Sequence, residues 1–385
     1  MNFPEAIPAA LALLSLGLLI WQWIAAARFP LHRRVTDHSF TPAITLLKPL
    51  KGCNATTAES LQSWFNQDYA GQIQILFGVA DASDPVCKVV QELIKNNPGH
   101  DAQLVVCAES LGTNGKVSTL AQLEPLARHP LILVGDADVR ITPDFLVNVV
   151  APLRDSSVGL VNCFYRLADS TTTAMRCEAI AINADFWSQV LQSTTFRPLD
   201  FALGAVMLTR RELLADIGGF IALINCLADD YQLGHRIERL GHHIELCPVV
   251  VECWEGPMFW RDVWKRQLRW ARTIRVCQPA PYFLSILSHV TLWSLVWLIT
   301  SLITSQPVWV PAIAAACLVI RIVLVQNLQR RLTQSGGKLT PPWLVPVKDL
   351  QQVAIWAGAF LGNSVEWRGQ KKRLQRDGTL LLEKA

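Results

Sequence analysis

The sequence carries two aspartates directly after an uninterrupted apolar run. The run Leu131–Gly135 is typical of a buried strand, and Asp136 and Asp138 follow it in an Asp-x-Asp arrangement. Two carboxylates at the end of a strand suit a hard divalent cation such as Mg²⁺ or Mn²⁺, which in turn neutralises a diphosphate. We predict that Asp136 and Asp138 form a metal and diphosphate site, with an ordinary turn or cap as the alternative.

A second acidic pair, Asp229 and Asp230, precedes a helical pattern over Gln232–Leu240. A carboxylate in such a place either caps the helix or acts as a positioned base that takes the proton from an attacking hydroxyl group. We predict that Asp230 is the base, with Asp229 as the alternative. Upstream, Gly204 either lets a substrate approach the backbone or serves packing.

Candidate contacts to a nucleotide lie at three further positions. Asp81 and Asp84 follow the apolar run Ile73–Val79, where a carboxylate can accept hydrogen bonds from a uracil or a ribose. Alternatively, Asp84 only caps the next helix. Lys116, at a predicted helix start, suits a phosphate, although a solvated loop lysine fits the same pattern.

The segment Phe259–Arg275 is amphipathic, because cationic side chains recur on one helical face beside tryptophans. A basic, Trp-rich helix that precedes an apolar run is typical of a membrane interface. Within it, Arg266 and Arg269 supply cations for a leaving diphosphate, and Trp270 supplies an aromatic wall for an acceptor. The two interpretations are compatible.

Short strand-like runs alternate with helical patterns between residues 43 and 165. Strands are predicted at Ala43–Pro49, Ile73–Val79, Gln103–Cys107, Leu131–Gly135 and Val158–Tyr165, and helices at Ala58–Asn66, Pro85–Asn96, Val117–Arg128 and Pro143–Ala151. This alternation indicates an α/β domain whose parallel sheet has helices on both faces. Ligands bind at the carboxyl ends of such strands, where the acidic residues lie.

The 385 residues are 51% hydrophobic and 17% charged, whereas about a quarter of the residues in an ordinary soluble protein are charged. The charges are unevenly placed, because Ala6–Ala27 and Val276–Ile320 carry none. The first run is long enough for one membrane-spanning helix, and the second, with a break at residues 305–307, for two. The composition excludes a disordered chain, and a net charge of +4 without a basic aromatic surface disfavours nucleic acid as a partner.

The basic stretch Arg28–Arg34 follows the first apolar run, so the positive-inside rule predicts a retained anchor with the following residues in the cytoplasm. A third apolar segment, Pro342–Gly362, is interrupted by Lys348 and Asp349. We expect an interfacial or re-entrant helix there, with a fourth span as the alternative. The expected divisions are an anchor over 1–27, a cytoplasmic catalytic domain over 28–258, an interfacial helix over 259–275, two spans over 276–326, and a basic loop, helix and cytoplasmic tail over 327–385.

In this order, the motifs resemble those of family 2-type glycosyltransferases and, more closely, the ceramide glucosyltransferase family (glycosyltransferase family 21), which includes bacterial hopanoid-associated glycosyltransferases. The residues that carry the resemblance are Lys48–Gly52, Asn66–Tyr69, Asp81, Asp84-Pro85, Asp136–Asp138, Asp230-Tyr231, Arg266, Arg269-Trp270 and Trp367–Gly369. The resemblance covers nearly the whole chain. It implies a GT-A fold, the Rossmann-like α/β fold of nucleotide-diphospho-sugar transferases, with transmembrane helices on either side.

The resemblance also implies an activity and a division of roles. The implied roles are nucleotide binding by Asp81, metal and diphosphate binding by Asp136 and Asp138, base catalysis by Asp230, and completion of the donor and acceptor site by Arg266, Arg269 and Trp270. Members transfer a sugar from a nucleotide sugar to a membrane lipid on the cytoplasmic face, with inversion. For this chain we expect a UDP-sugar donor of glucose or N-acetylglucosamine, with ceramide, a hopanoid or diacylglycerol as acceptor.

Two other functions fit parts of the pattern. A processive polysaccharide synthase shares the acidic motifs, but Arg266 stands where such synthases usually have glutamine, and about three spans are few for a polymer channel. A catalytically silent membrane scaffold or transporter is disfavoured, because every acidic position of the pattern is present.

Overall fold

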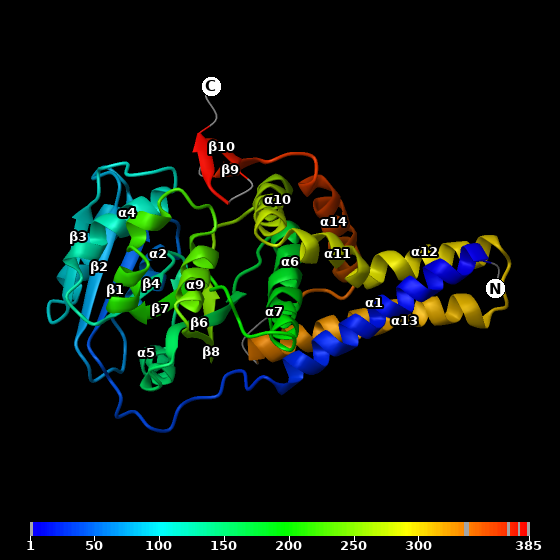
Figure 1. Cartoon of the computed structure of the whole chain (residues 1–385), viewed down its shortest axis with the longest axis horizontal. Helices are drawn as coiled ribbons and strands as arrows, with labels where there is room; N and C mark the ends of the chain where they lie inside the picture. The colour runs from blue at the N-terminus through cyan, green and yellow to red at the C-terminus, as the bar shows by residue number, and fades with distance from the viewer. Residues whose placement is uncertain (1–2, 335–338, 368–369, 376–377, 383–385) are drawn as a thin grey trace. The chain divides into compact units, whose positions relative to one another are not determined.

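A computed structural model describes residues 3–334, 339–367, 370–375 and 378–382 (Figure 1). Arg368 and Gly369, which belong to one of the motifs above, lie outside these residues. The chain divides into two compact units that do not follow chain order. The sheet unit comprises Pro30–Asp169, Arg197–Gly256 and Gly378–Ala385, and the helical unit comprises Met1–Phe29, Ser170–Phe196 and Pro257–Asp377.

The sheet unit is built on one large mixed sheet. Its strands within the described residues are β1 (Ile44–Leu50), β2 (Ile73–Val79), β3 (Asp101–Val106), β4 (Leu131–Gly135), β5 (Val139–Arg140), β6 (Val158–Leu167), β7 (Val206–Arg210) and β8 (His243–Cys253). They lie in the order β3-β2-β1-β4-β7-β6-β8-β5. The α/β class is therefore as predicted, and two strands, β2 and β4, have the predicted bounds.

The expectation of a wholly parallel sheet was wrong. β3, β2, β1 and β4 are parallel, and β6 and β8 are parallel to each other, but β7 runs antiparallel to both β4 and β6, and β5 runs antiparallel to β8. The chain leaves the sheet unit after β6 and returns to it before β7. Strand direction is set by that long connection, which local apolar patterns do not encode.

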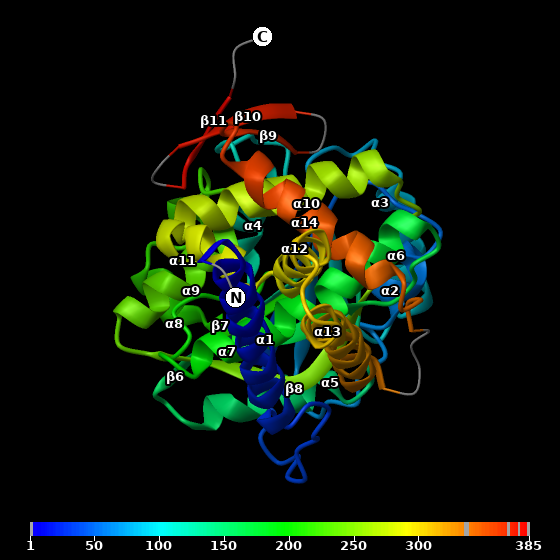
Figure 2. The same cartoon turned by 90° about the vertical axis from the view of Figure 1, so that its right-hand side faces the viewer.

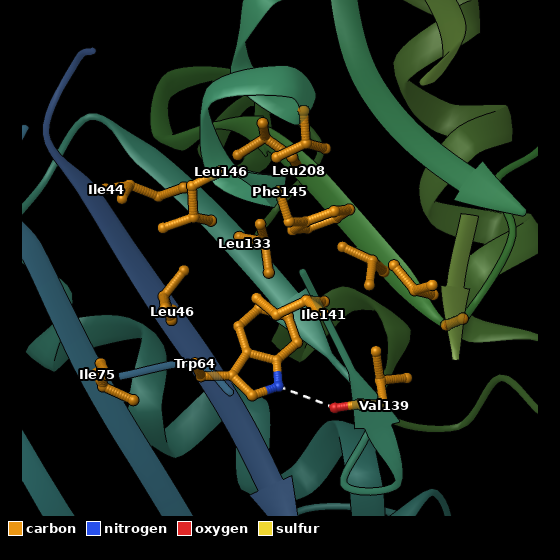
Figure 3. Packing of buried hydrophobic residues seen from close by; sticks show 14 of the residues in the cluster. Ile44, Leu46, Trp64, Ile75, Leu133, Val139, Ile141, Phe145, Leu146 and Leu208 are labelled. Carbon is orange, nitrogen blue, oxygen red and sulfur yellow. Dashed lines mark hydrogen bonds between the residues drawn. The ribbon is translucent and has the colours of Figure 1, made fainter. Parts of the chain in front are cut away.

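One face of the sheet carries a large hydrophobic cluster, to which alternate residues of each strand contribute because they point to the same side. Ile44 and Leu46 of β1, Ile75 of β2 and Leu133 of β4 are buried there. Trp64 packs into this cluster without any exposed surface, and its Nε1 donates to the carbonyl of Val139 at 2.9 Å (Figure 3).

The helices of the sheet unit are α2 (Thr57–Gln62), α3 (Val86–Asn96), α4 (Gly115–Leu123), α5 (Phe145–Val150), α8 (Arg211–Asp216) and α9 (Asp229–Arg239). The predicted helix Val117–Arg128 ends early, since Glu124–Leu126 is a short 3-10 turn. Its central Pro125 has no N–H to continue the α-helical hydrogen bonds. α4 covers the other face of the sheet, where a Cβ on Gly78 would lie only 2.5 Å from the Thr119 Cγ2.

In the helical unit, α1 (Phe3–Arg28), α12 (Val290–Ile303) and α13 (Trp309–Thr333) pack side by side (Figures 1 and 2). Of the described helices, two are long and apolar enough to cross a membrane, over Ala6–Arg28 and Trp309–Thr333. Residues Pro279–Ser288 and Val290–Ile303 form a pair bent by 45° that would be a third. The break expected at residues 305–307 lies between α12 and α13.

The helical unit also contains shorter helices and a pair of strands. They are α6 (Thr173–Ile180), the π-helix η3 (Ala181–Phe186), α7 (Trp187–Thr194), α10 (Trp260–Cys277), α11 (Pro279–Leu284), η5 (Ser285–Ser288), α14 (Leu344–Ala359) and the antiparallel strands β9 (Ser364–Trp367) and β10 (Gln370–Leu374). α6, η3 and α7 are continuous in sequence, so Thr173–Thr194 is one helical segment. It carries two buried carboxylates, which are described below.

A buried network of charged side chains joins η3, α13 and α14. Arg321 donates to both oxygens of Asp185, at 3.0 and 2.9 Å, and to both oxygens of Asp349, at 3.0 and 2.8 Å. Lys348 forms ion pairs with the same two carboxylates. The charges that interrupt the apolar segment Pro342–Gly362 are thus buried in a network of two cations and two anions.

Candidate active site

The parallel strands β1, β2 and β4 end at the same edge of the sheet, so the residues that follow them lie near one another. Lys116, at the start of α4, joins two of the acidic motifs. Its Nζ lies 2.7 Å from the Asp136 Oδ1 and 3.5 Å from the Asp229 Oδ2. The structure therefore brings the Asp-x-Asp turn and the acidic pair at α9 together around one cation.

The position of Lys116 follows from the start of its helix. Asn114 is the N-cap of α4, and its side-chain oxygen accepts hydrogen bonds from the N–H groups of Lys116 and Val117. The Lys116 side chain is only 12% exposed, so the alternative of a solvated loop lysine was wrong. Burial by itself lowers the pKa of Lys116, but Asp136 and Asp229 outweigh it and raise the pKa above its usual value. Lys116 is a permanent cation in this site.

Lys48 is a second buried lysine at this turn, and the sequence motifs assigned it no role. Its Nζ donates to the backbone carbonyl of Asp136 at 2.5 Å and lies 4.0 Å from the ring centroid of Trp64. Burial lowers the pKa of Lys48 to about 7, against the raising effects of Asp136 and Asp138. The contact holds the backbone of the Asp-x-Asp turn. One sequence feature could have indicated this contact: Lys48 lies inside an otherwise apolar strand, and a fully buried lysine requires a polar partner.

Asp138 lies close to other negative charges. Burial, together with the negative charges of Asp136 and Glu255, raises the pKa of Asp138 to about 7. A divalent cation relieves such repulsion, and Mg²⁺ is commonly held by one or two carboxylates together with substrate phosphates and water. Asp136 and Asp138 therefore fit a metal ion that also binds a diphosphate. In the described part of the chain, no group of three or more His, Cys, Asp or Glu side chains is arranged to hold a metal by itself.

Asp230 lies in the first turn of α9, where its Oδ1 accepts the N–H of Tyr231 at 2.8 Å. Burial and the neighbouring negative charge of Asp229, partly offset by Lys116, raise the pKa of Asp230 to about 6. A base whose pKa lies near the working pH can both accept a proton and release it. The position thus suits general-base catalysis.

Gly204 is in direct contact with this carboxylate, because a Cβ at position 204 would lie 2.7 Å from the Asp230 Oδ2. We expect Gly204→Ala to push the carboxylate from its place and to lower kcat by about 10²-fold, as small displacements of a catalytic group do. Steady-state kinetics check this. Gly99→Ala is the matched control, since no atom lies within 4 Å of its added Cβ. Equal kcat in the two variants would contradict the prediction.

The pKa of Asp230 also predicts the acid limb of the pH profile. Only the ionised carboxylate accepts a proton, so we expect kcat/KM to fall about tenfold per pH unit below about pH 6. Asp229→Asn removes a negative charge that raises this pKa, so the limb should move to lower pH. Initial rates between pH 4.5 and 8.5 test both statements. A limb that stays in place in Asp229→Asn would show that another group titrates.

Asp81 and Asp84 differ in what their oxygens contact. Asp81 is exposed, and its Oδ1 accepts the N–H and the hydroxyl of Ser83, both at 2.8 Å, which lowers the pKa of Asp81. It is ionised and open to a ligand. Asp84 accepts the N–H of Gly52 at 2.9 and 3.0 Å and that of Val86 at 3.0 Å. Asp84 therefore ties the loop after β1 to the start of α3.

Arg266, Arg269 and Trp270 lie in the helical unit, on α10. The Arg266 Nε donates to the Oε1 of Glu178 at 2.8 Å, and its Nη2 donates to the Oε2. The guanidinium carbon of Arg266 lies 5.4 Å from the Trp270 ring centroid. Arg269 lines a cavity of about 200 Å³ between α10 and the strands β9 and β10.

The chain is similar to glycosyltransferases of known identity. The family model described as Glycosyl transferase family 21 matches residues 7–380. Ceramide glucosyltransferase 3 of Caenorhabditis elegans is 24% identical over 227 residues, which are 57% of this chain and 48% of that protein. Ceramide glucosyltransferase of Candida albicans is 30% identical over 128 residues, which are 30% of this chain and 24% of that protein. The matches thus span about half, or less, of the length of these relatives.

One solved structure resembles nearly the whole chain. It is the mannosyltransferase of Pyrobaculum calidifontis in complex with GDP-Man and Mn²⁺, with a TM-score of 0.55 and 20% identity, covering 92% of this chain and 98% of that one. At this identity the likeness concerns the fold alone. It confirms the prediction of a GT-A glycosyltransferase fold.

Proposed function

Because the chain belongs to glycosyl transferase family 21, we propose that this glycosyltransferase moves a hexose from a UDP-sugar to a hydroxyl group of a membrane lipid, with inversion. One observation carries the proposal. Two acidic motifs of the sheet unit, the Asp136-x-Asp138 turn and the Asp229-Asp230 pair, meet at Lys116, near the carboxyl ends of parallel strands. This is where an α/β sheet binds a nucleotide.

Residues at the ends of β2 and β4 bind the UDP-sugar donor in this proposal. Asp81, exposed and ionised, accepts hydrogen bonds from the uridine. Asp136 and Asp138 would hold Mg²⁺ or Mn²⁺, which when bound would supply positive charge to neutralise the diphosphate. Lys116 already lies at 2.7 Å from Asp136, so it is placed to neutralise phosphate charge at the same turn. Arg266 and Arg269 add cationic charge for the leaving group.

Asp230 activates the lipid acceptor in this proposal. Its carboxylate removes the proton from the lipid hydroxyl as the hydroxyl oxygen bonds to the anomeric carbon. The bond between that carbon and the diphosphate oxygen breaks on the opposite side, and UDP leaves with the electron pair. A single displacement of this kind inverts the anomeric centre.

A lipid acceptor requires a site that meets the bilayer, and the helical unit suits that requirement. The helices Ala6–Arg28 and Trp309–Thr333 are long enough to span, and α10 exposes Trp260 and Trp264, at 46% and 37%, as interfacial tryptophans are. We assign the protein as multi-pass, with its active site on the cytoplasmic face. Ceramide, a hopanoid and diacylglycerol are the acceptor candidates.

The test is a transfer assay with purified full-length protein in nanodiscs that contain one candidate lipid. UDP release and mass spectrometry of the lipid fraction are measured with UDP-glucose and with UDP-N-acetylglucosamine, each with Mn²⁺, Mg²⁺ or EDTA. We expect a lipid heavier by one hexosyl or N-acetylhexosaminyl group, made only with metal, and a β-linkage by NMR from the α-linked donor. A polymeric product, or UDP release without lipid product, would overturn the proposal.

A further inference from the structure

Glu178 is a buried carboxylate that no motif includes. It lies on α6 with a side chain that has no exposed surface, and its two oxygens accept the Arg266 Nε, at 2.8 Å, and Nη2. A buried carboxylate without a cation beside it would be strongly destabilising. The pair is therefore fixed in place, and the charges of the two side chains offset each other.

The side-on contact determines how the guanidinium of Arg266 is oriented. Two donors along one edge of a planar group fix both its position and its plane, which a single contact does not. Trp270 lies beside the same group, at 5.4 Å. Glu178 and Trp270 are thus both neighbours of the Arg266 guanidinium, and the Arg266 side chain remains 14% exposed.

The helical segment that carries Glu178 is itself held at a second point. Asp185, seven positions later in the same segment, is bound by both nitrogens of the Arg321 fork at 3.0 and 2.9 Å and also by Lys348. The segment therefore carries two buried carboxylates, and each forms an ion pair with an arginine from a different helix. Only one of these arginines belongs to a motif with an expected role in transfer.

We propose that Glu178 is a positioning residue for catalysis: its fork with Arg266 fixes the position and plane of the guanidinium to which the proposed function gives a role toward the leaving diphosphate. The inference rests on the proposed function, which gives Arg266 that role. Asp185, by contrast, acts only in the folding of the helical unit. The two carboxylates share burial, chemistry and helical segment, so they make a matched pair for a test.

The test measures kcat, KM for the UDP-sugar and the thermal midpoint of Glu178→Gln and Asp185→Asn in full-length protein. We expect Glu178→Gln to lower kcat per folded molecule by about 10²-fold, because the fork loses its charge and one acceptor and the guanidinium turns. Asp185→Asn should lower the thermal midpoint and leave kcat per folded molecule within about threefold of the parent. Glu178→Asp is the second variant, should Glu178→Gln fail to fold. It keeps the negative charge but shortens the side chain by one methylene, and we expect it to lower kcat by about tenfold.

Arg266→Ala separates this inference from the proposed function. If Arg266→Ala loses turnover while Glu178→Gln and Glu178→Asp keep it, Glu178 is only a structural partner and the inference is wrong. If Arg266→Ala itself keeps full turnover, Arg266 does not have the role that the proposed function gives it, and the inference about Glu178 is wrong as well. Parallel losses in kcat for the Glu178 and Arg266 variants, with normal turnover in Asp185→Asn, support both.

Discussion

Asp230→Asn is expected to lower kcat by about 10²–10⁴-fold, the usual contribution of a general base. Asparagine keeps the shape of the side chain and an oxygen that accepts the N–H of Tyr231, so the start of α9 should persist. The amide cannot take the proton of an acceptor hydroxyl. KM for the UDP-sugar should change by no more than about threefold, because the removed interaction belongs to the transition state.

Initial rates of UDP release and equilibrium titration of the UDP-sugar give the two quantities. Asp229→Asn is the matched control, since Asp229 carries the same group one residue earlier and contacts Lys116 and Asn114 instead. We expect it to retain most of its turnover. A severe loss in Asp229→Asn together with near-normal turnover in Asp230→Asn would move the base to Asp229.

Arg321→Leu is expected to lower the free energy of unfolding by about 3–5 kcal/mol, the typical cost of breaking a buried charge pair. Removal of this side chain leaves Asp185 and Asp349 facing a single cation, Lys348. Four hydrogen bonds between η3, α13 and α14 are lost at the same time. Denaturation of the detergent-solubilised protein, followed by fluorescence, measures the change.

Two further variants make this result interpretable. Arg330→Leu removes an exposed arginine from the same helix, so its effect should stay within about 0.5 kcal/mol. Arg321→Leu combined with Asp349→Asn restores the balance between Asp185 and Lys348, and we expect it to be more stable than Arg321→Leu alone. Equal stability of Arg321→Leu and the parent would mean that the network contributes nothing to folding.

Secondary structure in the first half of the sheet could be predicted from the sequence because its signals are local. β2 and β4 are continuous apolar runs bounded by polar turns, and both bounds agree with prediction. β5, β7 and β8 were not predicted. The sheet is mixed because a long connection through Ser170–Phe196 separates β6 from β7, which runs antiparallel to β4 and β6. No residue pattern within a strand records the direction in which such a connection brings the strand back.

The candidate site also has some features that are local in the sequence and others that depend on the fold. The acidic side chains at strand and helix ends are visible in the sequence, since a carboxylate after an apolar run is a local feature. The pairing of Lys116 with Asp136 and Asp229, the contact of Lys48 with the Asp-x-Asp turn, and the contact of Gly204 with Asp230 join residues tens of positions apart. Each depends on strand order and register.

Local patterns in the sequence are enough to identify which chemical groups are available: carboxylates at the ends of apolar runs, a basic tryptophan-rich helix, and charge-free segments of membrane-spanning length. Which of these charges are paired and which are open to a ligand depends on contacts between distant segments of the folded chain. Lys116 became a buried cation, Asp81 stayed exposed, and Lys348 and Asp349, which looked like interruptions of an apolar helix, became part of a balanced network with Arg321. The physical reason is that the free energy of a charge depends on its burial and its nearest partners, and packing between distant segments fixes both.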